Sequence, residues 1–201
     1  MSRERLQYES KAAALVARSV LGVRYWDVRC FGGGPRIWDY GDWHHAVMGV
    51  ELLTDCGPSC VLWTSTFYPY GVEVFQSPMS EHIVRCEAGP ESWDASGSDR
   101  WRGKLSSPVM DVQVFWEQIA VGLAPADSAR GADSYTYTVD VPVALRIDFA
   151  AGSAWMVAGI PQAPEMQEVS VPGDEIMVVF SARRMRQIGF PDSEFVPASR
   201  D

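Results

Sequence analysis

The chain has 201 residues, of which 47% are hydrophobic and 21% charged; this is the composition of a packed globular protein and excludes an intrinsically disordered one. Its formal net charge of −9 excludes the basic face with which nucleic-acid-binding proteins neutralise phosphates. No apolar run approaches the roughly 18 residues of a membrane-spanning helix, and the N-terminal segment lacks the pattern of a secretion signal. We therefore expect a cytoplasmic protein with reduced cysteines, no nucleic-acid partner and no membrane association.

The first predicted element is a helix over residues 3–21, because a partial apolar stripe runs through this segment and Gly22 follows it as a typical stop. Residues 23–31 alternate in polarity and are rich in β-formers, which predicts a strand. The glycine-proline run 32–35 then breaks this strand. No Lys-Ser or Lys-Thr pair follows the glycines, so we expect a loop rather than a phosphate-binding site.

A β-hairpin is predicted from residues 47–54 and 60–67, two apolar runs on either side of a turn that contains Gly57. Cys56 and Cys60 flank this turn with three residues between them. A zinc site needs a second such cysteine pair, and the chain has none. We expect small turn-flanking thiols, which could form a disulfide on oxidation.

The middle of the chain is predicted to contain a short strand over 72–75 and then a long polar connection over 76–104. One short strand is expected within this connection, at 83–86. Residues 109–119 fit both a helix and a strand. Pro108 suits a helix start, whereas the β-branched residues favour a strand, and we prefer the strand.

A second hairpin is predicted from strands over 135–149 and 153–160. Pro142 lacks a backbone N–H and therefore places the first of these strands at an edge or a break. The proline-rich stretch 161–173 is predicted to be irregular. The acidic pair 174–175 follows it, either as solvated turn residues or as a base or metal ligand.

Residues 176–180 form a continuous apolar run, which is typical of a buried strand. Ser181 is a suitable N-cap for a final helix over 182–188, and Gly189 ends that helix. The whole pattern predicts a β-rich α+β fold. Its antiparallel hairpins would form one curved sheet or a two-sheet sandwich, flanked by an N-terminal helix and a short C-terminal helix.

We expect one globular domain, 1–201, built from two similar hairpin halves at about residues 23–104 and 105–190. Residues 50–57 and 145–152 share an alternation of apolar and charged positions that ends in a turn glycine. This likeness indicates a weak internal duplication, although hairpins in general share these features.

Carboxylates and imidazoles gather in one stretch, at Asp39, Asp42, His44, His45 and Glu51. If the protein is an enzyme, Asp42, His44 and His45 are the candidates for acid and base. Asp42 and His44 would share one face of a strand and are also the candidate metal ligands, whereas His45 would point to the other face. Their spacing matches no metalloenzyme motif, so we predict neither a metal nor a cofactor.

The same stretch carries aromatic residues among acids, and its candidate binding residues are Trp38, Asp39, Tyr40, Asp42 and Trp43. Tryptophan supplies a large contact area with a polar handle, and no catalytic signature such as a nucleophile elbow is present. We therefore expect an acidic interaction protein without catalytic activity, of the inhibitor or immunity type, that binds a basic protein partner. The alternatives are a small enzyme or small-ligand binder with an Asp/His site between the two hairpin halves, and a structural subunit of a larger assembly.

Overall fold

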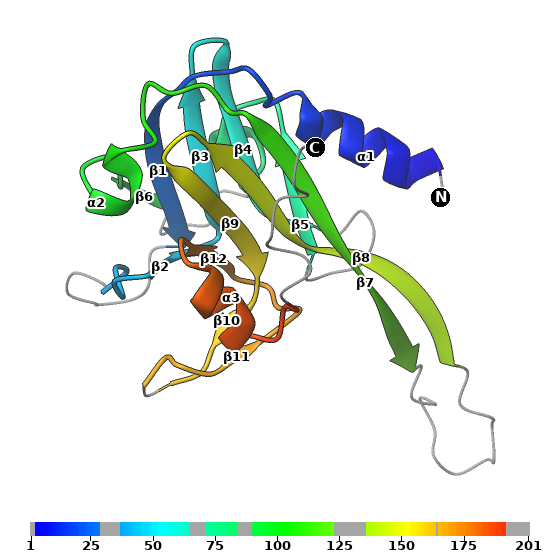
Figure 1. Cartoon of the computed structure of the whole chain (residues 1–201). Coiled ribbons are helices and arrows are strands. Elements are labelled where there is room, and N and C mark those ends of the chain that lie inside the picture. The colour runs from blue at the N-terminus through cyan, green and yellow to red at the C-terminus, as the bar shows by residue number, and fades with distance from the viewer. Residues whose placement is uncertain are drawn as a thin grey trace, which may run out of the picture.

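The computed structural model describes residues 3–28, 37–64, 71–83, 90–122, 136–163 and 165–191. This part of the chain is rich in strands, with α1 near its start and the short α3 near its end, and the predicted α+β class is confirmed (Figure 1). In chain order the elements are α1 (Arg3–Ala13), β1 (Val20–Val28), β2 (Trp43–Val47), β3 (Gly49–Thr54), β4 (Gly57–Thr64), β5 (Gly71–Phe75), the 3₁₀-helix η1 (Met79–Glu81), β6 (Pro90–Asp94), α2 (Asp99–Arg102), β7 (Asp111–Gly122), β8 (Thr136–Phe149), β9 (Gly152–Ala158), β10 (Ile160–Pro161), β11 (Val169–Ser170), β12 (Ile176–Val179) and α3 (Ala182–Gln187).

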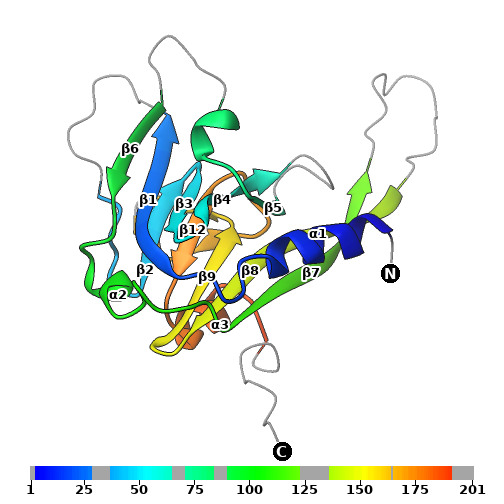
Figure 2. The same cartoon turned by 90° about the horizontal axis from the view of Figure 1, so that it is seen from above.

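One large sheet dominates the described part of the chain. Its strands pair in the order β5-β4-β3-β1-β2-β12-β9-β8-β7, and β6 also pairs with β1. The sheet curls, so that strands of its first half face strands of its second half across a shared core (Figure 2). The predicted curved sheet is therefore confirmed. The core draws on both halves and includes Val20, Val23, Leu52, Val72, Leu145, Ile147, Met156 and Val178.

Helix α1 bridges the two terminal strands of the sheet, β5 and β7. Tyr8 Oη donates a hydrogen bond to Val72 O in β5 (2.7 Å), and the Tyr8 ring packs edge-on against Trp116 in β7. Glu9 Oε1 accepts a hydrogen bond from Trp116 Nε1 (3.0 Å). The helix therefore covers the side on which the curled sheet is open.

The sheet changes direction between β2 and β3, which follow each other in sequence. Strand β2 pairs with β12 and, at Val47 opposite Trp26, in parallel with β1, whereas β3 pairs with β1 in the antiparallel direction. Val47 has a left-handed φ of 55°, and Met48 N donates to Trp26 O (3.0 Å). A Cβ on Gly49 would lie 2.6 Å from Val61 O, closer than real Cβ contacts come. The kink and the missing side chain together let the chain pass from one half of the sheet to the other.

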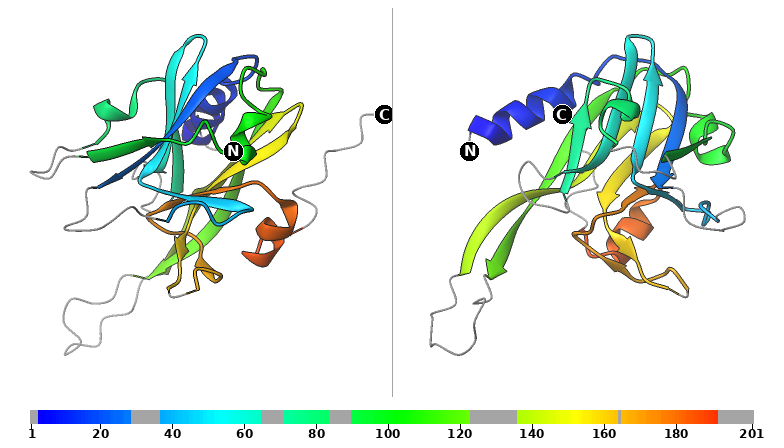
Figure 3. Two further views of the ribbon diagram at one scale, coloured as in Figure 1. Left: turned by 90° about the vertical axis from the view of Figure 1, so that its left-hand side faces the viewer. Right: turned by 180° about the vertical axis from the view of Figure 1, so that it is seen from behind.

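Strands β7 and β8 extend beyond the rest of the molecule (Figure 3). Strand β9 pairs with β8 only over residues 144–149, so residues 116–122 and 136–142 continue as a two-stranded ribbon, which we call the arm. Pro142 stands at a register shift opposite Trp116, where β8 has no β9 neighbour. Its missing N–H therefore leaves no β9 hydrogen bond unmade, as expected of an edge position.

Helix α3 covers the outer face of the second half of the sheet. Ser181 Oγ accepts from Arg184 N (3.1 Å), and Gly189 follows the helix with a φ of +102°, so the predicted cap and stop are both confirmed. Met185 and Phe190 pack into the cluster on this face.

The predicted helix over 3–21 is wrong at its C-terminal end. Ala17 has a left-handed φ of 67°, which an α-helix does not allow. Ser19 N donates to Asp55 Oδ1 (3.1 Å), and Asp55 N donates to Ser19 O (3.1 Å). Pairing with the first hairpin therefore draws the last predicted helical residues into the start of β1.

The predicted polar connection over 76–104 is wrong in part, because it contains β6 and α2. Strand β6 exists through its pairing with β1, a contact between distant segments that no local pattern announces. Residues 84–86 of the short strand predicted there lie outside the described residues, as do 29–31 and 65–67 of two other predicted strands.

Residues 109–119 contain most of β7, so the strand was the right choice. Both hairpins, β3–β4 and β8–β9, are also confirmed. Each closes through a tight turn that ends in a glycine with positive φ, Gly57 (110°) and Gly152 (101°). Many hairpins share this turn, so the duplication of the two halves stays a prediction.

Candidate functional site: a clamped loop over a buried imidazole

Residues 37–42 lead into β2, and we call them the aromatic loop. Trp38 O accepts a hydrogen bond from His45 N (2.8 Å), and Tyr40 N donates to Trp43 O (3.0 Å). The loop therefore folds back on the first residues of the strand that it precedes, as a short antiparallel bridge.

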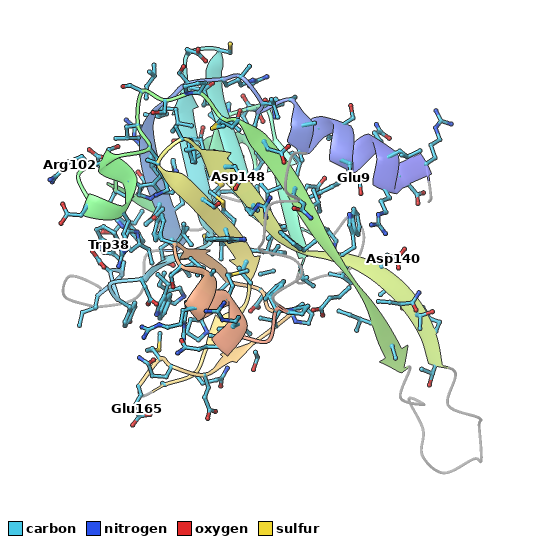
Figure 4. All side chains as sticks on the ribbon, in the orientation of Figure 1. Glu9, Trp38, Arg102, Asp140, Asp148 and Glu165 are labelled. Atoms are coloured by element: carbon cyan, nitrogen blue, oxygen red, sulfur yellow. The ribbon has the colours of Figure 1, made fainter. Side chains whose placement is uncertain are left out.

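Two more contacts hold the loop from its other side. Asp39 Oδ1 accepts from Gly41 N (2.8 Å), which is an Asx turn, and Arg100 Nε in α2 donates to Gly41 O. Ile37 points outward and is 71% exposed. Trp38 lies beside it in sequence, at the same end of the molecule as α2 (Figure 4).

The loop rests on a group of rings that we call the aromatic cluster, which comprises Tyr25, Trp38, His44, Trp93, Trp101 and Phe180. Trp38 is half-buried and packs edge-on against His44 and Tyr25, with ring centroids 4.9 and 5.6 Å apart. Phe180 also packs edge-on against His44, at 4.7 Å. Edge-to-face pairs are favourable ring geometries, so the cluster gives Trp38 a well-defined position.

A hydrogen-bond chain runs through the cluster. Trp101 Nε1 donates to Tyr25 Oη (2.6 Å), and Tyr25 Oη lies 2.7 Å from His44 Nδ1. Because an indole N–H can only donate, the tyrosine oxygen accepts it and directs its own hydrogen to His44 Nδ1. The neutral imidazole then carries its hydrogen on Nε2, which lies 3.6 Å from Asp39 Oδ1.

Burial keeps both titratable members of this chain neutral. It lowers the pKa of His44 to about 4, an effect that nearby Asp39 opposes and Arg100 reinforces. Burial also raises the pKa of Tyr25 well above its ordinary value, although the hydrogen bond from Trp101 acts in the opposite direction. At neutral pH the imidazole and the phenol of this hydrogen-bond chain are therefore both uncharged.

The order carboxylate, imidazole, hydroxyl is that of an activated nucleophile. Here, however, both Tyr25 and His44 are 0% exposed, and the tyrosine hydroxyl is engaged on both sides. A substrate in solvent cannot reach that hydroxyl in this conformation. In this conformation the hydrogen-bond chain positions the rings against which Trp38 packs.

The candidate acid-base residues Asp42, His44 and His45 do not converge. Asp42 Oδ2 accepts from Ser181 Oγ (3.1 Å) at the start of α3, whereas His44 faces the core. His45 Nε2 lies 2.7 Å from Glu175 Oε2 on the opposite face of β2, as alternation along a strand requires. The shared Asp42–His44 face expected from the sequence is therefore not formed. Among the residues that the structure describes, no three His, Cys, Asp or Glu side chains gather as metal ligands would.

The five candidate binding residues divide into exposed and buried members. Trp43 is only 1% exposed, with the Tyr40 ring stacked on it at 4.3 Å and the Arg184 guanidinium over it at 5.5 Å. Trp43 therefore presents almost no surface in this conformation, and its binding role stays a prediction. Asp39 and Trp38 keep exposed surface, and their binding role stays a prediction.

The sequence analysis missed Ile37, Tyr25, Trp93, Trp101 and Phe180. The four rings come from β1, β6, α2 and the residue that follows β12, and only strand pairing and packing bring them together. The local signal for Ile37 was weak, because a single apolar residue beside a tryptophan is common.

The cysteine pair in the first hairpin does not form a disulfide. Cys56 is exposed in the turn, whereas Cys60 is buried with Met79 and Ile83, and both are free thiols. Burial, with a smaller effect of Glu51, raises the pKa of Cys60 to about 12. Because the reactive form is the thiolate, this thiol has little reactivity at neutral pH.

None of the protein families, curated proteins or solved structures compared with the chain matches it. Among the described residues, no helix is both long and apolar enough to cross a membrane.

Proposed function

We propose that the chain is an acidic, cytoplasmic interaction protein without catalytic activity, of the inhibitor or immunity type, that binds a basic protein partner through the aromatic loop. The observation that supports this proposal is that the loop exposes apolar and aromatic side chains to solvent, whereas the candidate acid-base side chains of β2 are buried. Ile37 is 71% exposed beside a half-buried Trp38, whereas the imidazole of His44 is buried behind Trp38 and that of His45 is buried on the opposite face of β2.

The way the loop is held supports docking. Binding costs free energy for every side chain and loop that must be ordered at the interface. Here backbone hydrogen bonds, the Asp39 turn and the contact with Arg100 already order the loop. Aromatic residues in well-packed surroundings are also typical binding hot spots, which suits Trp38.

The charge of the molecule supports a basic partner. The chain carries a net charge of −9, and complementary potentials speed the encounter of two proteins. The Asp39 carboxylate is half exposed and lies within the proposed contact surface. It would meet a cation of the partner at the rim of the interface.

Photo-crosslinking tests this proposal. A photoreactive residue placed at Ile37, in lysate of cells that naturally produce the chain, should yield a single basic protein as the major adduct. The Trp38→Ala change should reduce that adduct strongly, since it removes the proposed anchor. The same probe placed at Met110, which is 54% exposed, is the matched control and should not yield this adduct. No adduct at position 37, or equal adducts at both positions, would contradict docking through the aromatic loop.

One observation favours the second candidate, a small-ligand binder or small enzyme. His44 Nε2 and Trp93 Nε1 are both buried without a hydrogen-bond partner among the described residues, and Trp38 contacts both rings. Two unsatisfied N–H donors could serve a small polar ligand if Trp38 moved aside. A small polar molecule that co-purifies with the protein in stoichiometric amount, and that is lost from the His44→Gln variant, would support this candidate over docking.

A further inference from the structure

The arm has free strand edges. Strand β7 is the last strand of the sheet, and none of the described segments pairs with its outer edge along the arm. On the other side of the arm, β8 has no β9 neighbour before residue 144. Free edges carry unpaired N–H and C=O groups, which are a template for a further strand.

Proteins usually protect such edges with Lys, Pro, short strands or a covering segment. Residues 111–122 contain no Lys, Arg or Pro, and β7 is long compared with the usual five or six residues of a strand. Helix α1 reaches β7 where the arm begins, at Trp116, with Arg5 over the ring and paired to Glu9. From residue 117 onward, Glu117 is the only charged residue of β7, and none of the described segments pairs with the outer edge.

The two faces of the arm differ. On one face Ile119 lies opposite Val139, and Val121 lies opposite Tyr137, which is 46% exposed. This apolar face continues the cluster beneath α3, against which Ile119 and Val139 pack. The other face is polar, with Gln118 opposite Asp140, whereas Glu117 stands on the apolar face, two residues before Ile119 and opposite Val141. A strand added to the β7 edge would extend both faces and cover apolar surface on one of them.

The negative charge of the arm favours a basic strand as the partner of the β7 edge. Glu117 and Asp140 are exposed (Asp140 is labelled in Figure 4), and residues 117–122 and 136–142 contain no Lys or Arg. A second copy would bring an equally acidic strand to this edge, and like charges on neighbouring strands are destabilising. A strand with Lys or Arg opposite Glu117 and an apolar residue opposite Ile119 would gain an ion pair and buried apolar surface.

We propose that the β7 edge of the arm binds an extended, basic segment of a partner protein as an additional β-strand. Main-chain hydrogen bonds hold the segment, the apolar face takes its alternate side chains, and Glu117 selects for positive charge. This surface lies on different elements from the aromatic loop and does not depend on the function proposed for that loop.

Peptide binding tests the proposal with the full chain. The probe is a fluorescent peptide about as long as the arm, with lysines among valines and threonines, and its comparison peptide has glutamate at every lysine. We expect the lysine peptide to bind at least about tenfold more tightly in fluorescence anisotropy, and methylation of alternate backbone nitrogens to abolish binding.

Charge reversal locates the site. Glu117→Lys should weaken binding of the lysine peptide by about five- to tenfold, since attraction becomes repulsion across one strand pair. Glu165→Lys changes the net charge equally at an exposed position between β10 and β11 and should leave binding unchanged. Trp38→Ala should also leave it unchanged, which separates this site from the aromatic loop.

Four results would overturn the proposal. Equal weakening by Glu117→Lys and Glu165→Lys, or tight binding of the methylated peptide, would show general attraction of charge rather than strand addition. A dimer in sedimentation that competes with the peptide would identify a second copy as the occupant. Binding of both peptides only after truncation at Pro191 would identify the chain's own C-terminal segment.

Discussion

His44 has no exposed surface, faces Tyr25 through Nδ1 and points Nε2 toward Asp39. The same side chain on an exposed loop would be a plausible acid, base or metal ligand. Burial changes its role, because the charged form would lose its hydration while the nearby carboxylate compensates only in part. For His44, solvent accessibility and hydrogen-bond partners therefore determine which role the imidazole can have, and the residue type alone does not.

The low pKa of His44 predicts acid sensitivity. In the unfolded chain this imidazole binds a proton below about pH 6.5, whereas in the folded protein it does so only near pH 4. Between these values the unfolded state binds more protons, so the free energy of unfolding should fall as the pH falls from 6.5 to 4, by up to about 3 kcal/mol in all. Urea denaturation across this range measures the loss.

The His44→Gln variant should lose most of this slope, whatever its stability at neutral pH. His82→Gln is the matched control, because His82 lies elsewhere, against Ser77 and Phe75, and it should keep the slope. An unchanged slope in His44→Gln would show that other groups cause the acid sensitivity.

The kink between β2 and β3 determines where the aromatic loop lies in the fold. It separates β2, which lies between β1 and β12, from β3, which lies on the other side of β1, and the aromatic loop before β2 meets rings from both halves of the sheet. Gly49 is the residue that makes the kink compact, because its missing Cβ leaves room for Val61 O. The hairpin β3–β4 that follows has a regular register, and the kink at Val47 before it determines its direction relative to β2.

Gly49→Ala should therefore destabilise the protein. Its Cβ would lie 2.6 Å from a backbone oxygen that can move only with β4, and overpacking of this kind costs about 1–3 kcal/mol. Gly97→Ala is the matched control, since a Cβ there meets nothing within 4 Å, and its effect should stay within about 0.5 kcal/mol. Urea midpoints measure both changes. Equal midpoints would mean that β3 and β4 separate without cost.

Across the whole molecule, the arm differs from the rest of the sheet in strand pairing and in burial. Strands β9 and β12 are paired on both sides and buried on both faces, whereas the arm is two strands wide with exposed residues on both. Two-stranded ribbons are marginally stable in water without further packing. The arm therefore belongs to the low-stability part of the fold, where surfaces that bind partners are commonly found.

Hydrogen exchange should show this gradient in the free protein. Amides at residues 117–122 and 136–140 should exchange much faster than those of β9 and β12, since opening the arm breaks few packed contacts. Mass spectrometry with short peptic fragments resolves the two regions, and β9 and β12 act as the internal reference. Addition of the lysine peptide should slow exchange in the arm alone. Arm amides as protected as those of β12 in the free protein would contradict this picture.

The sequence by itself determined the local elements. The β-branched content of 109–119 favoured β7, strand-like runs on either side of a turn predicted the two hairpins, Gly57 and Gly152 indicated the turns, and Ser181 and Gly189 bounded α3. These are short-range properties, because a period of two and the residues that allow positive φ depend on neighbours in the chain.

Only the tertiary structure decided which side chains meet. It separated Asp42 from His44, buried Trp43, placed β6 beside β1 and left the arm unpaired. Strand pairing joins residues far apart in sequence, and each register sends a side chain either to the core or to solvent. The fold class therefore followed from local patterns, whereas the buried imidazole and the free edge followed from contacts between distant segments.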